Sequence, residues 1–260
     1  MKFKQSQLSK LTAATLGALV MMSAAPAMAG TIDFESVTPT IYGGTEVFTE
    51  ANYKLTVIDT PAAGPGGIGF AGAVGDGSDE YLCAIAACPT GNTSNFYLGV
   101  NDGSLKVERS DSRLFQVSSI DYAFLAPVGG LPSYSYGQLT LVGVRSDGVT
   151  TISYSYDFPL LNDLGNSPFV TQALQNTFGN VYLSSLTIGS CLFDGSGGCS
   201  SPLAGSENQS QFAIDNLQVT AVPEPETYAM MGLGLGLVGW LSRRRARAAQ
   251  AAAPTAVIAA

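Results

Sequence analysis

Residues 138–156 read QLTLVGVRSDGVTTISYSY and carry the clearest indication of the fold. Both ends of this stretch, residues 138–144 and 150–156, alternate apolar or aromatic residues with small polar ones. Between them lies Ser146-Asp147-Gly148, a combination that favours a tight turn. Two alternating segments on either side of a glycine-containing turn predict an antiparallel β-hairpin.

Strand-like segments continue along most of the chain and are separated by clusters of Gly, Pro, Asn and Asp. They lie at residues 31–37, 53–58, 95–100, 105–109, 118–125, 181–188 and 211–220. Only residues 160–178 have a helical pattern, and Pro168 divides that stretch. The pattern predicts an all-β fold, and we expect an antiparallel β-sandwich of jelly-roll type.

The N-terminus has the three parts of a secretory signal peptide. Three lysines precede a short apolar run at residues 11–22, and small residues at 25–29 (APAMA) provide a cleavage site after Ala29. We therefore expect residues 1–29 to be removed on export. An ordinary N-terminal helix is the alternative.

The C-terminus contains a second apolar segment. Residues 228–241 (YAMMGLGLGLVGWL) contain no charge and are followed by a stop-transfer cluster that includes Arg243, Arg244 and Arg245. A spanning helix normally needs about 20 apolar residues, so the segment predicts only a short C-terminal transmembrane helix. Arginines after such a segment stay cytoplasmic, which places the rest of the chain outside.

The C-terminal layout resembles the PEP-CTERM sorting signal. Pro223-Glu224-Pro225 precedes the apolar segment and the arginines, so the resemblance covers residues 222–247. It implies an exosortase partner that recognises the triplet just outside the membrane in polysaccharide-producing Gram-negative bacteria. Residues 211–215 (QFAID) resemble the Gln-Phe-x-x-Asp signature of one subgroup. The exported parts of similar proteins are expected to be β-sandwiches; the alanine-rich tail at residues 248–260 departs from the pattern.

Between the two signals, residues 30–221 have the length of one extracytoplasmic domain. This range holds five basic and 18 acidic residues, hence a net charge of −13. Nucleic acid is therefore not an expected partner, because its binding requires cationic contacts to phosphates. The absence of histidine excludes Ser-His-Asp and Cys-His catalysis and His-ligated metals.

Four cysteines form two pairs that are close in sequence, Cys83 with Cys88 and Cys191 with Cys199. Outside the cytoplasm disulfides are the expected state. Four cysteines allow three connectivities. We favour the two local pairs because each brackets a loop of small residues.

No cofactor is required by the sequence, but structural calcium is a candidate. Calcium takes six to eight oxygen ligands, which acid-rich segments supply. The favoured group is Asp33 and Glu35 in the first strand with Asp215 in the last, since the terminal strands of jelly rolls often lie side by side. The alternative is that Asp33 and Glu35 face solvent and Asp215 caps a turn. A second acidic group lies in a glycine-rich loop at Asp76, Asp79 and Glu80.

Four tyrosines around the central hairpin are candidates for sugar binding: Tyr134, Tyr136, Tyr154 and Tyr156. Each pair is spaced by two residues and so points to one face of a strand. Tyrosine rings stack on sugar faces while their hydroxyls form hydrogen bonds. Cross-strand packing is the alternative.

These observations predict a non-catalytic exported protein, anchored in the inner membrane during transit and then displayed in the cell envelope or outside the cell. Association with exopolysaccharide or a biofilm is the expected setting. A carbohydrate-binding module is one alternative. The other is a glycoside hydrolase with a carboxylate pair, although no spacing in the sequence selects such a pair.

Overall fold

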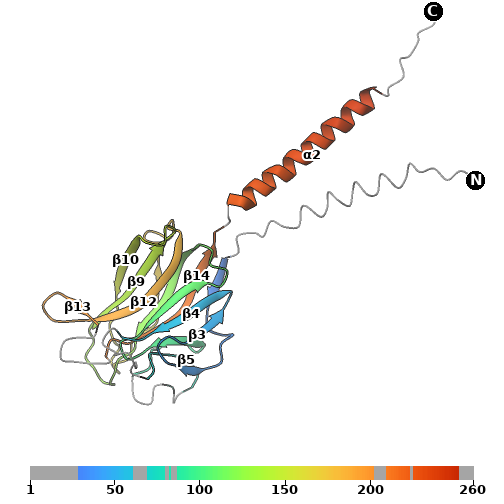
Figure 1. Ribbon diagram of the computed structural model, residues 1–260. Helices are drawn as coiled ribbons and strands as arrows, with labels where there is room; N and C mark the ends of the chain where they lie inside the picture. The colour runs from blue at the N-terminus through green and yellow to red at the C-terminus, as the bar shows by residue number, and fades with distance from the viewer. Residues whose placement is uncertain are drawn as a thin grey trace, which may run out of the picture. The chain divides into compact units, whose positions relative to one another are not determined.

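A computed structural model describes residues 29–60, 69–79, 82, 87–201, 209–222 and 225–251 (Figure 1). The chain divides into two compact units, one of which is Met28–Val222 and holds all the strands described below. The signal-peptide prediction falls on residues 1–28, outside the described part, except for Ala29. That residue begins the first strand, β1 (Ala29–Ile32), opposite Thr220.

The fourteen strands found among the described residues belong to one hydrogen-bonded sheet in which the named strands pair antiparallel, and the sheet has two halves. The first half runs in the order β2-β5-β6-β14-β8-β11, with β1 paired to β14. Its remaining strands are β2 (Thr40–Tyr42), β5 (Gly72–Asp76), β6 (Asn95–Gly99), β8 (Phe115–Phe124), β11 (Val170–Ala173) and β14 (Phe212–Ala221).

The second half runs in the order β3-β4-β7-β12-β9-β10, and a short strand β13 pairs antiparallel with the end of β12. Phe115 and Leu183 form the single pair between β8 and β12 that joins it to the first half. Its strands are β3 (Val47–Glu50), β4 (Tyr53–Ile58), β7 (Ser104–Arg109), β9 (Gly137–Arg145), β10 (Thr151–Asp157), β12 (Leu183–Phe193) and β13 (Cys199–Ser200).

The two halves pack face to face around the main core, and a smaller buried cluster that includes Phe96 and Leu98 belongs to the first half alone. Rings from both halves meet there: Phe48 of β3 lies 6.3 Å from Tyr97 of β6, and Tyr53 of β4 lies 5.4 Å from Phe115 of β8. Alternate residues of each strand point into this core, as a pleated strand requires. The prediction of an antiparallel, sandwich-like all-β domain is therefore confirmed, and its jelly-roll type stays a prediction.

The hairpin predicted at residues 138–156 is confirmed as β9 and β10, with Leu141 opposite Tyr154. The Asp147 side chain holds its turn by accepting hydrogen bonds from the amides of Val149 (2.9 Å) and Thr150 (2.8 Å). An aspartate that closes a turn on its own backbone is the reason this residue type favours turns.

The helix indicated at residues 160–178 is wrong. Residues 162–166 form a turn in which the Asn162 side chain accepts from the amides of Leu164 and Asn166, and β11 follows as an edge strand beside β8. Pro168 explains the difference, since proline disfavours helical backbone at the preceding residue. Asparagine and glycine before it favour a turn over a helix.

The second unit contains α2 (Pro225–Ala251), a helix of 27 residues. It extends beyond both ends of the predicted apolar helix at residues 228–241, which confirms the helix itself. Among the described residues no helix is sufficiently long and apolar to cross a membrane, so the predicted crossing is not confirmed.

Candidate functional site

The sorting segment begins directly where the β domain ends. β14 ends at Ala221, and the amide of Val222 donates to the carbonyl of Leu114 at 3.1 Å. Pro223 and Glu224 lie outside the described residues, and Pro225 is the first residue of α2. Backbone hydrogen bonds therefore hold the end of the β domain in place up to Val222, the residue before the predicted recognition triplet.

Within α2 the apolar and basic parts follow each other as the sequence predicts. Leu233, Leu237 and Trp240 are exposed. The guanidinium of Arg244 lies 4.5 Å from the centre of the Trp240 ring, a cation–π contact. Arg243 and Arg245 are exposed beside it.

Among the described residues of the β domain, the most deeply buried carboxylate is that of Asp215, the last residue of the QFAID segment. Asp215 is 1% exposed. Its Oδ2 accepts from Asn92 Nδ2 (2.7 Å) and Ser94 Oγ (3.1 Å), and its Oδ1 accepts from the Asn216 amide (2.7 Å). It thereby attaches the loop before β6 to the middle of β14.

A second carboxylate lies opposite Asp215 on the neighbouring strand. Asp121 of β8 is its cross-strand partner, and the Asn216 side-chain amide donates to both carboxylates, at 3.0 Å to Asp121 and 3.3 Å to Asp215. Burial raises the pKa of Asp215 to about 6, and the charge of Asp121 acts in the same direction. The hydrogen bonds from Asn92, Asn216 and Ser94 oppose the rise.

Glu50, at the end of β3, is a buried carboxylate that the sequence analysis did not select. It is 5% exposed and accepts from the Phe34 amide (2.9 Å) and from Ser36 Oγ (3.4 Å). Burial raises the pKa of Glu50 to about 7, and a hydrogen bond with Asp33 contributes to the rise. The signal that marks it is the alternation of β3, which places Glu50 on the inward face with Phe48.

The turn that Glu50 holds is strained. Phe34 is fully buried and has a φ of +60°, a left-handed conformation that a bulky residue rarely adopts. Its carbonyl accepts from Asn95 Nδ2 at 3.3 Å, and Glu35 Oε1 accepts from the Asn95 amide at 2.8 Å. Such strain costs about 1–3 kcal/mol and persists only where the surroundings enforce it. Glu50 and Asn95 provide that enforcement.

An open pocket of about 320 Å³ lies beside Glu50. Ala51 and Asn52, which form the turn between β3 and β4, both have positive φ. The pocket is lined by Ser36, Thr49, Glu50, Ala51, Asn52 and Ser110. All of these except Ala51 carry a polar side chain. The pocket is therefore suited to polar ligands rather than to apolar ones.

The folded state binds the Glu50 proton more tightly than the unfolded chain does, because its pKa rises from 4.5 to about 7. Stability is therefore expected to fall as pH rises from about 4.5 to 7 and to be level above that range. Glu50→Gln keeps a carbonyl for Phe34 and places an amide towards Asp33. We expect it to match the parent at pH 5 and to be more stable by roughly 1–2 kcal/mol at pH 8, after allowance for solvent screening.

Urea unfolding of both proteins at pH 5, 6, 7 and 8 measures this effect. An equally steep fall of stability with pH in Glu50→Gln contradicts the assignment to Glu50.

Each of the predicted calcium ligands already accepts hydrogen bonds from other residues of the protein. Asp33 Oδ1 accepts from the Glu35 amide (3.3 Å), and Glu35 and Asp215 bind the Asn92–Asn95 segment as described above. In the part of the chain that the structure describes, no group of three acidic or cysteine side chains is gathered to hold a metal ion. Asp76 accepts from the Ser78 amide at 2.8 Å, and Glu80 lies outside the described residues. The geometry gives the calcium hypothesis no support.

The four tyrosines do not share one surface. Tyr136 stacks on Phe124 of the core at 5.9 Å, with the exposed Tyr134 at its edge. Tyr154 meets Phe178 edge-on at 5.4 Å, and the Tyr156 hydroxyl bonds to Thr177 Oγ1 at 2.9 Å. Three of the four are engaged in packing within the domain, which is the alternative that the sequence left open.

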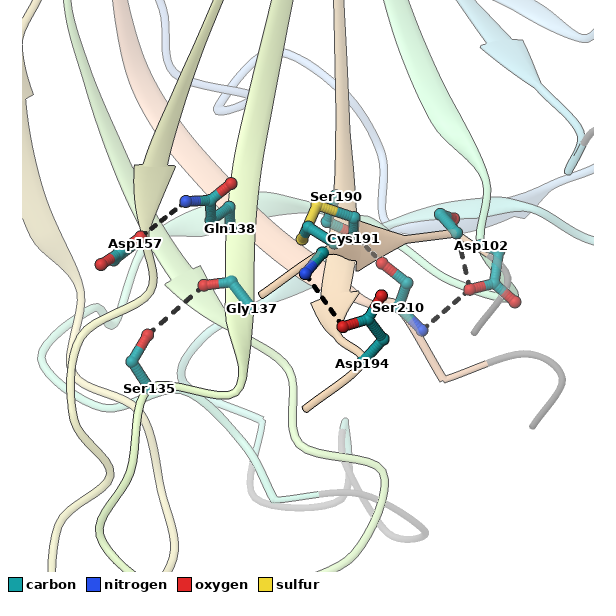
Figure 2. Close-up of a disulfide and its surroundings, with 12 residues drawn as sticks. Asp102, Ser135, Gly137, Gln138, Asp157, Ser190, Cys191, Asp194 and Ser210 are labelled. Carbon is teal, nitrogen blue, oxygen red and sulfur yellow. Dashed lines mark hydrogen bonds between the residues drawn. A yellow bond between two sulfur atoms is a disulfide. The ribbon is translucent and has the colours of Figure 1, made fainter. Parts of the chain in front are cut away.

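The local disulfide Cys191–Cys199 is confirmed and closes the β12–β13 turn, with 5.4 Å between the two Cα atoms (Figure 2). Asp194 holds this turn by accepting from the amides of Ser196 and Gly198. Cys88 is also disulfide-bonded, and its predicted partner Cys83 lies outside the described residues.

Beside the disulfide, Asp102 joins two chain segments (Figure 2). Its Oδ1 accepts from the Ser210 amide at 2.9 Å, while the Ser210 and Ser190 hydroxyls bond to each other at 2.9 Å. Asp102 is 4% exposed and has a positive φ in the β6–β7 turn. It connects this turn to the segment leading into β14.

Comparison with known proteins identifies the C-terminal signal. Residues 221–246 match the PEP-CTERM protein-sorting motif. This motif is processed by an exosortase, so the chain carries the signal of an exported protein that is sorted at the membrane to the cell envelope or exterior. Membership of the Gln-Phe-x-x-Asp subgroup stays a prediction.

Two solved structures of DUF4465 family proteins are similar to the β domain. One, from Bacteroides caccae, is 12% identical with a TM-score of 0.47, and the other, from Bacteroides ovatus, is 7% identical with a TM-score of 0.42. Each alignment covers 75% of this chain and 100% of the other. No protein of curated function matches the chain.

Proposed function

We propose that this protein is a non-catalytic β-sandwich delivered through an exosortase system and displayed in the cell envelope or extracellular matrix, in association with exopolysaccharide. The observation that carries the proposal is the sorting motif at residues 221–246, which starts at the last residue of β14. Export fits the disulfide Cys191–Cys199, because disulfides persist outside the reducing cytoplasm.

The carboxylates of the domain favour a non-catalytic role over the glycosidase alternative. Glycoside cleavage needs two carboxyls about 5–5.5 Å or about 6.5–9.5 Å apart, one on each side of the scissile bond. Glu50 is 5% exposed and accepts from the Phe34 amide and Ser36 Oγ, so its carboxylate serves the fold of its own chain. Asp215 is buried and saturated by Asn92, Ser94 and Asn216.

Processing at Pro223-Glu224-Pro225 is expected to depend on the exosortase. Intact mass of the protein from its native host should end near Pro223 in the parent strain and retain the arginines in a strain without exosortase. Replacement of the triplet by alanines should give the unprocessed mass in both strains, because the recognition site is lost.

The control is Glu226→Ala, which changes an acidic residue outside the triplet and should be processed normally. If the mass retains the arginines and the alanine tail in the parent strain as well, the prediction of exosortase processing is contradicted.

A further inference from the structure

The last strand of the second half, β10, is an open edge of the sheet. Among the described strands it pairs with β9 alone, and it lies at the outer border of the second half (Figure 1). An open edge exposes a row of backbone donors and acceptors that can pair with another strand. We therefore ask which of these groups are free and which strand would fit them.

The direction of the backbone groups along β10 follows from the bonds at its two ends. The Thr150 carbonyl accepts from the Arg145 amide at 2.8 Å, and the Phe158 amide donates to the Gly137 carbonyl at 2.9 Å. Bonded and non-bonded pairs alternate in an antiparallel ladder, so the even-numbered residues of β10 bond to β9. The odd-numbered residues point their amides and carbonyls away from β9. They are Thr151, Ser153, Ser155 and Asp157.

One of these outward backbone groups has a partner in the part of the chain that the structure describes. The Asp157 carbonyl accepts from the Tyr122 hydroxyl at 2.8 Å, which closes that end of the edge. No other hydrogen bond from the described residues reaches the outward amides and carbonyls of Thr151, Ser153 or Ser155. The side chains of these three residues are also exposed. The greater part of the edge is therefore open to a partner.

β10 lacks the features by which natural sheets protect their edges, namely short length, lysine, proline, bulges or an inward-pointing charge. The other described strands with a single partner have two to four residues. Of these, β3 carries the buried carboxylate of Glu50 and β11 follows Pro168. β10 has seven residues without lysine or proline, and its register with β9 has no shift. It is the edge at which pairing is least hindered.

The sequence of β10 is complementary to itself when two copies run antiparallel around Tyr154. In this register Ser153 lies opposite Ser155 of the second copy, and Thr151 lies opposite Asp157 of the second copy. The outward backbone groups of one copy then meet those of the other, as a bonded antiparallel ladder requires. Two hydroxyls, or a hydroxyl and a carboxylate, are favourable cross-strand neighbours. A second copy therefore fits the whole length of the edge.

Exposed apolar side chains flank β10 at both ends. Val149 in the turn before the strand is 83% exposed, and Leu160 after the strand is 62% exposed. The same register brings Val149 of one copy beside Pro159 and Leu160 of the other, and the two-fold symmetry repeats this contact at the opposite end. Such contacts remove apolar surface from water. A second copy therefore covers the flanks as well as the edge.

The net charge of −13 opposes association of two β domains, but little of it lies on this edge. Asp157 is the only charged residue of β10. In the antiparallel register the two Asp157 residues are six positions apart along the strands, which is about 20 Å. The Debye length at physiological ionic strength is about 8 Å, so this repulsion is largely screened.

We propose that two copies of this protein associate by antiparallel pairing of their β10 strands, which continues the second half of the sheet from one copy into the next. The inference goes beyond the proposed function and does not depend on it, because the pairing needs only the folded β domain. A single pair of strands is a small interface, so the association is of the weak, transient class.

Disulfide cross-linking tests the register, on the full chain in detergent micelles that cover the exposed apolar side chains of α2. Ser153→Cys and Ser155→Cys are oxidised separately and as an equal mixture, and the joined peptides are identified by mass. Directly opposite residues lie within disulfide reach, whereas diagonal ones lie about 7–8 Å apart. We therefore expect the mixture to cross-link at least about fivefold more than either variant alone.

Val142→Cys is the control for cross-linking, because it lies on the same exposed face one strand inside the edge, opposite Ser153. It should not cross-link. No cross-link in the mixture, or equal yields from the mixture and the single variants, overturns the inference. A yield from Val142→Cys that matches the mixture assigns the contact to the face of the sheet and overturns it too.

Molar mass by light scattering, followed from about 1 to 500 µM in the same micelles, tests the use of the edge. The parent should move from one copy towards two. Ser153→Pro removes an amide that faces the open edge, where proline is tolerated, and should weaken association at least about tenfold. Leu160→Ser, outside β10, should weaken it about threefold through the lost apolar contact. About 0.5 M salt should strengthen it, because the like charge of the two domains is screened.

Thermal unfolding of each variant checks that it is folded. A parent that keeps the mass of one copy throughout overturns the inference, and so does a folded Ser153→Pro variant that associates as the parent does. Weaker association in salt would mean that opposite charges on other surfaces join the copies, which also overturns edge pairing. Should the proline variant be unfolded, the cross-linking pattern and Leu160→Ser decide. None of these measurements depends on exosortase processing.

Discussion

Asp215→Ala is expected to destabilise the β domain by about 2–4 kcal/mol and to lower its Tm by roughly 5–15 °C. The substitution removes the acceptor for Asn92, Ser94 and the Asn216 amide while these donors stay folded around a buried position. A buried donor without an acceptor costs more than a missing hydrogen bond, because it has already lost its contact with water. Thermal and urea unfolding at pH 7 measure the effect.

Asp215→Asn is the matched control. Its amide oxygen keeps accepting from Asn92 and Ser94, and the like-charge contact with Asp121 disappears. Only the bond from the Asn216 amide is lost, so the expected cost is about 1 kcal/mol. Equal losses in the alanine and asparagine variants would contradict a hydrogen-bonding role for Asp215.

Local pattern is the part of this fold that the sequence predicts well. The hairpin at residues 138–156 and the last strand with its QFAID segment appear where alternation and turn residues place them. The disulfide Cys191–Cys199 is one of the two local pairings that the sequence favoured among three connectivities, and it closes a short turn. In the hairpin and the disulfide the deciding contacts join residues that are near in sequence, whereas the last strand is recognised by its own alternation.

The sequence could not predict the buried polar network, because its hydrogen bonds join residues that are far apart in the sequence. Glu50 bonds to Phe34 and Ser36, while Asn92 and Ser94 reach Asp215 more than a hundred residues away. In the sequence an acidic residue in a strand reads as solvent-facing. The alternation of β3 places Glu50 on the inward face with Phe48, but only the pairing of strands shows which residues Glu50 and Asp215 contact.

Sugar binding by the four tyrosines stays a prediction, and the sequence could not show how these rings are packed, for the same physical reason. Alternation correctly puts Tyr154 and Tyr156 on one face of β10, but it does not say which face is covered. The structure places Phe178 and Thr177 against them, so both rings serve packing.

Phe212→Ala, in the same segment as Asp215, is expected to cost about 3–5 kcal/mol. Phe212 is fully buried and lies 6.2 Å from the Tyr97 ring, between the two halves of the core. Its ring also covers Gly99, its partner on β6, so closely that a Cβ at Gly99 would overlap the ring. Gly99→Ala alone should therefore cost about 2–3 kcal/mol through overpacking.

The two substitutions should not add. In the Phe212→Ala background the methyl of Gly99→Ala enters the space that the ring has vacated, which relieves the overlap and fills part of the cavity. We expect the double variant to be more stable than the sum of the single losses predicts, by about 1–3 kcal/mol. Urea unfolding of the four proteins completes the cycle. Simple additivity would mean that the ring does not rest on Gly99, and that the Gln-Phe-x-x-Asp segment is fixed by Asp215 alone.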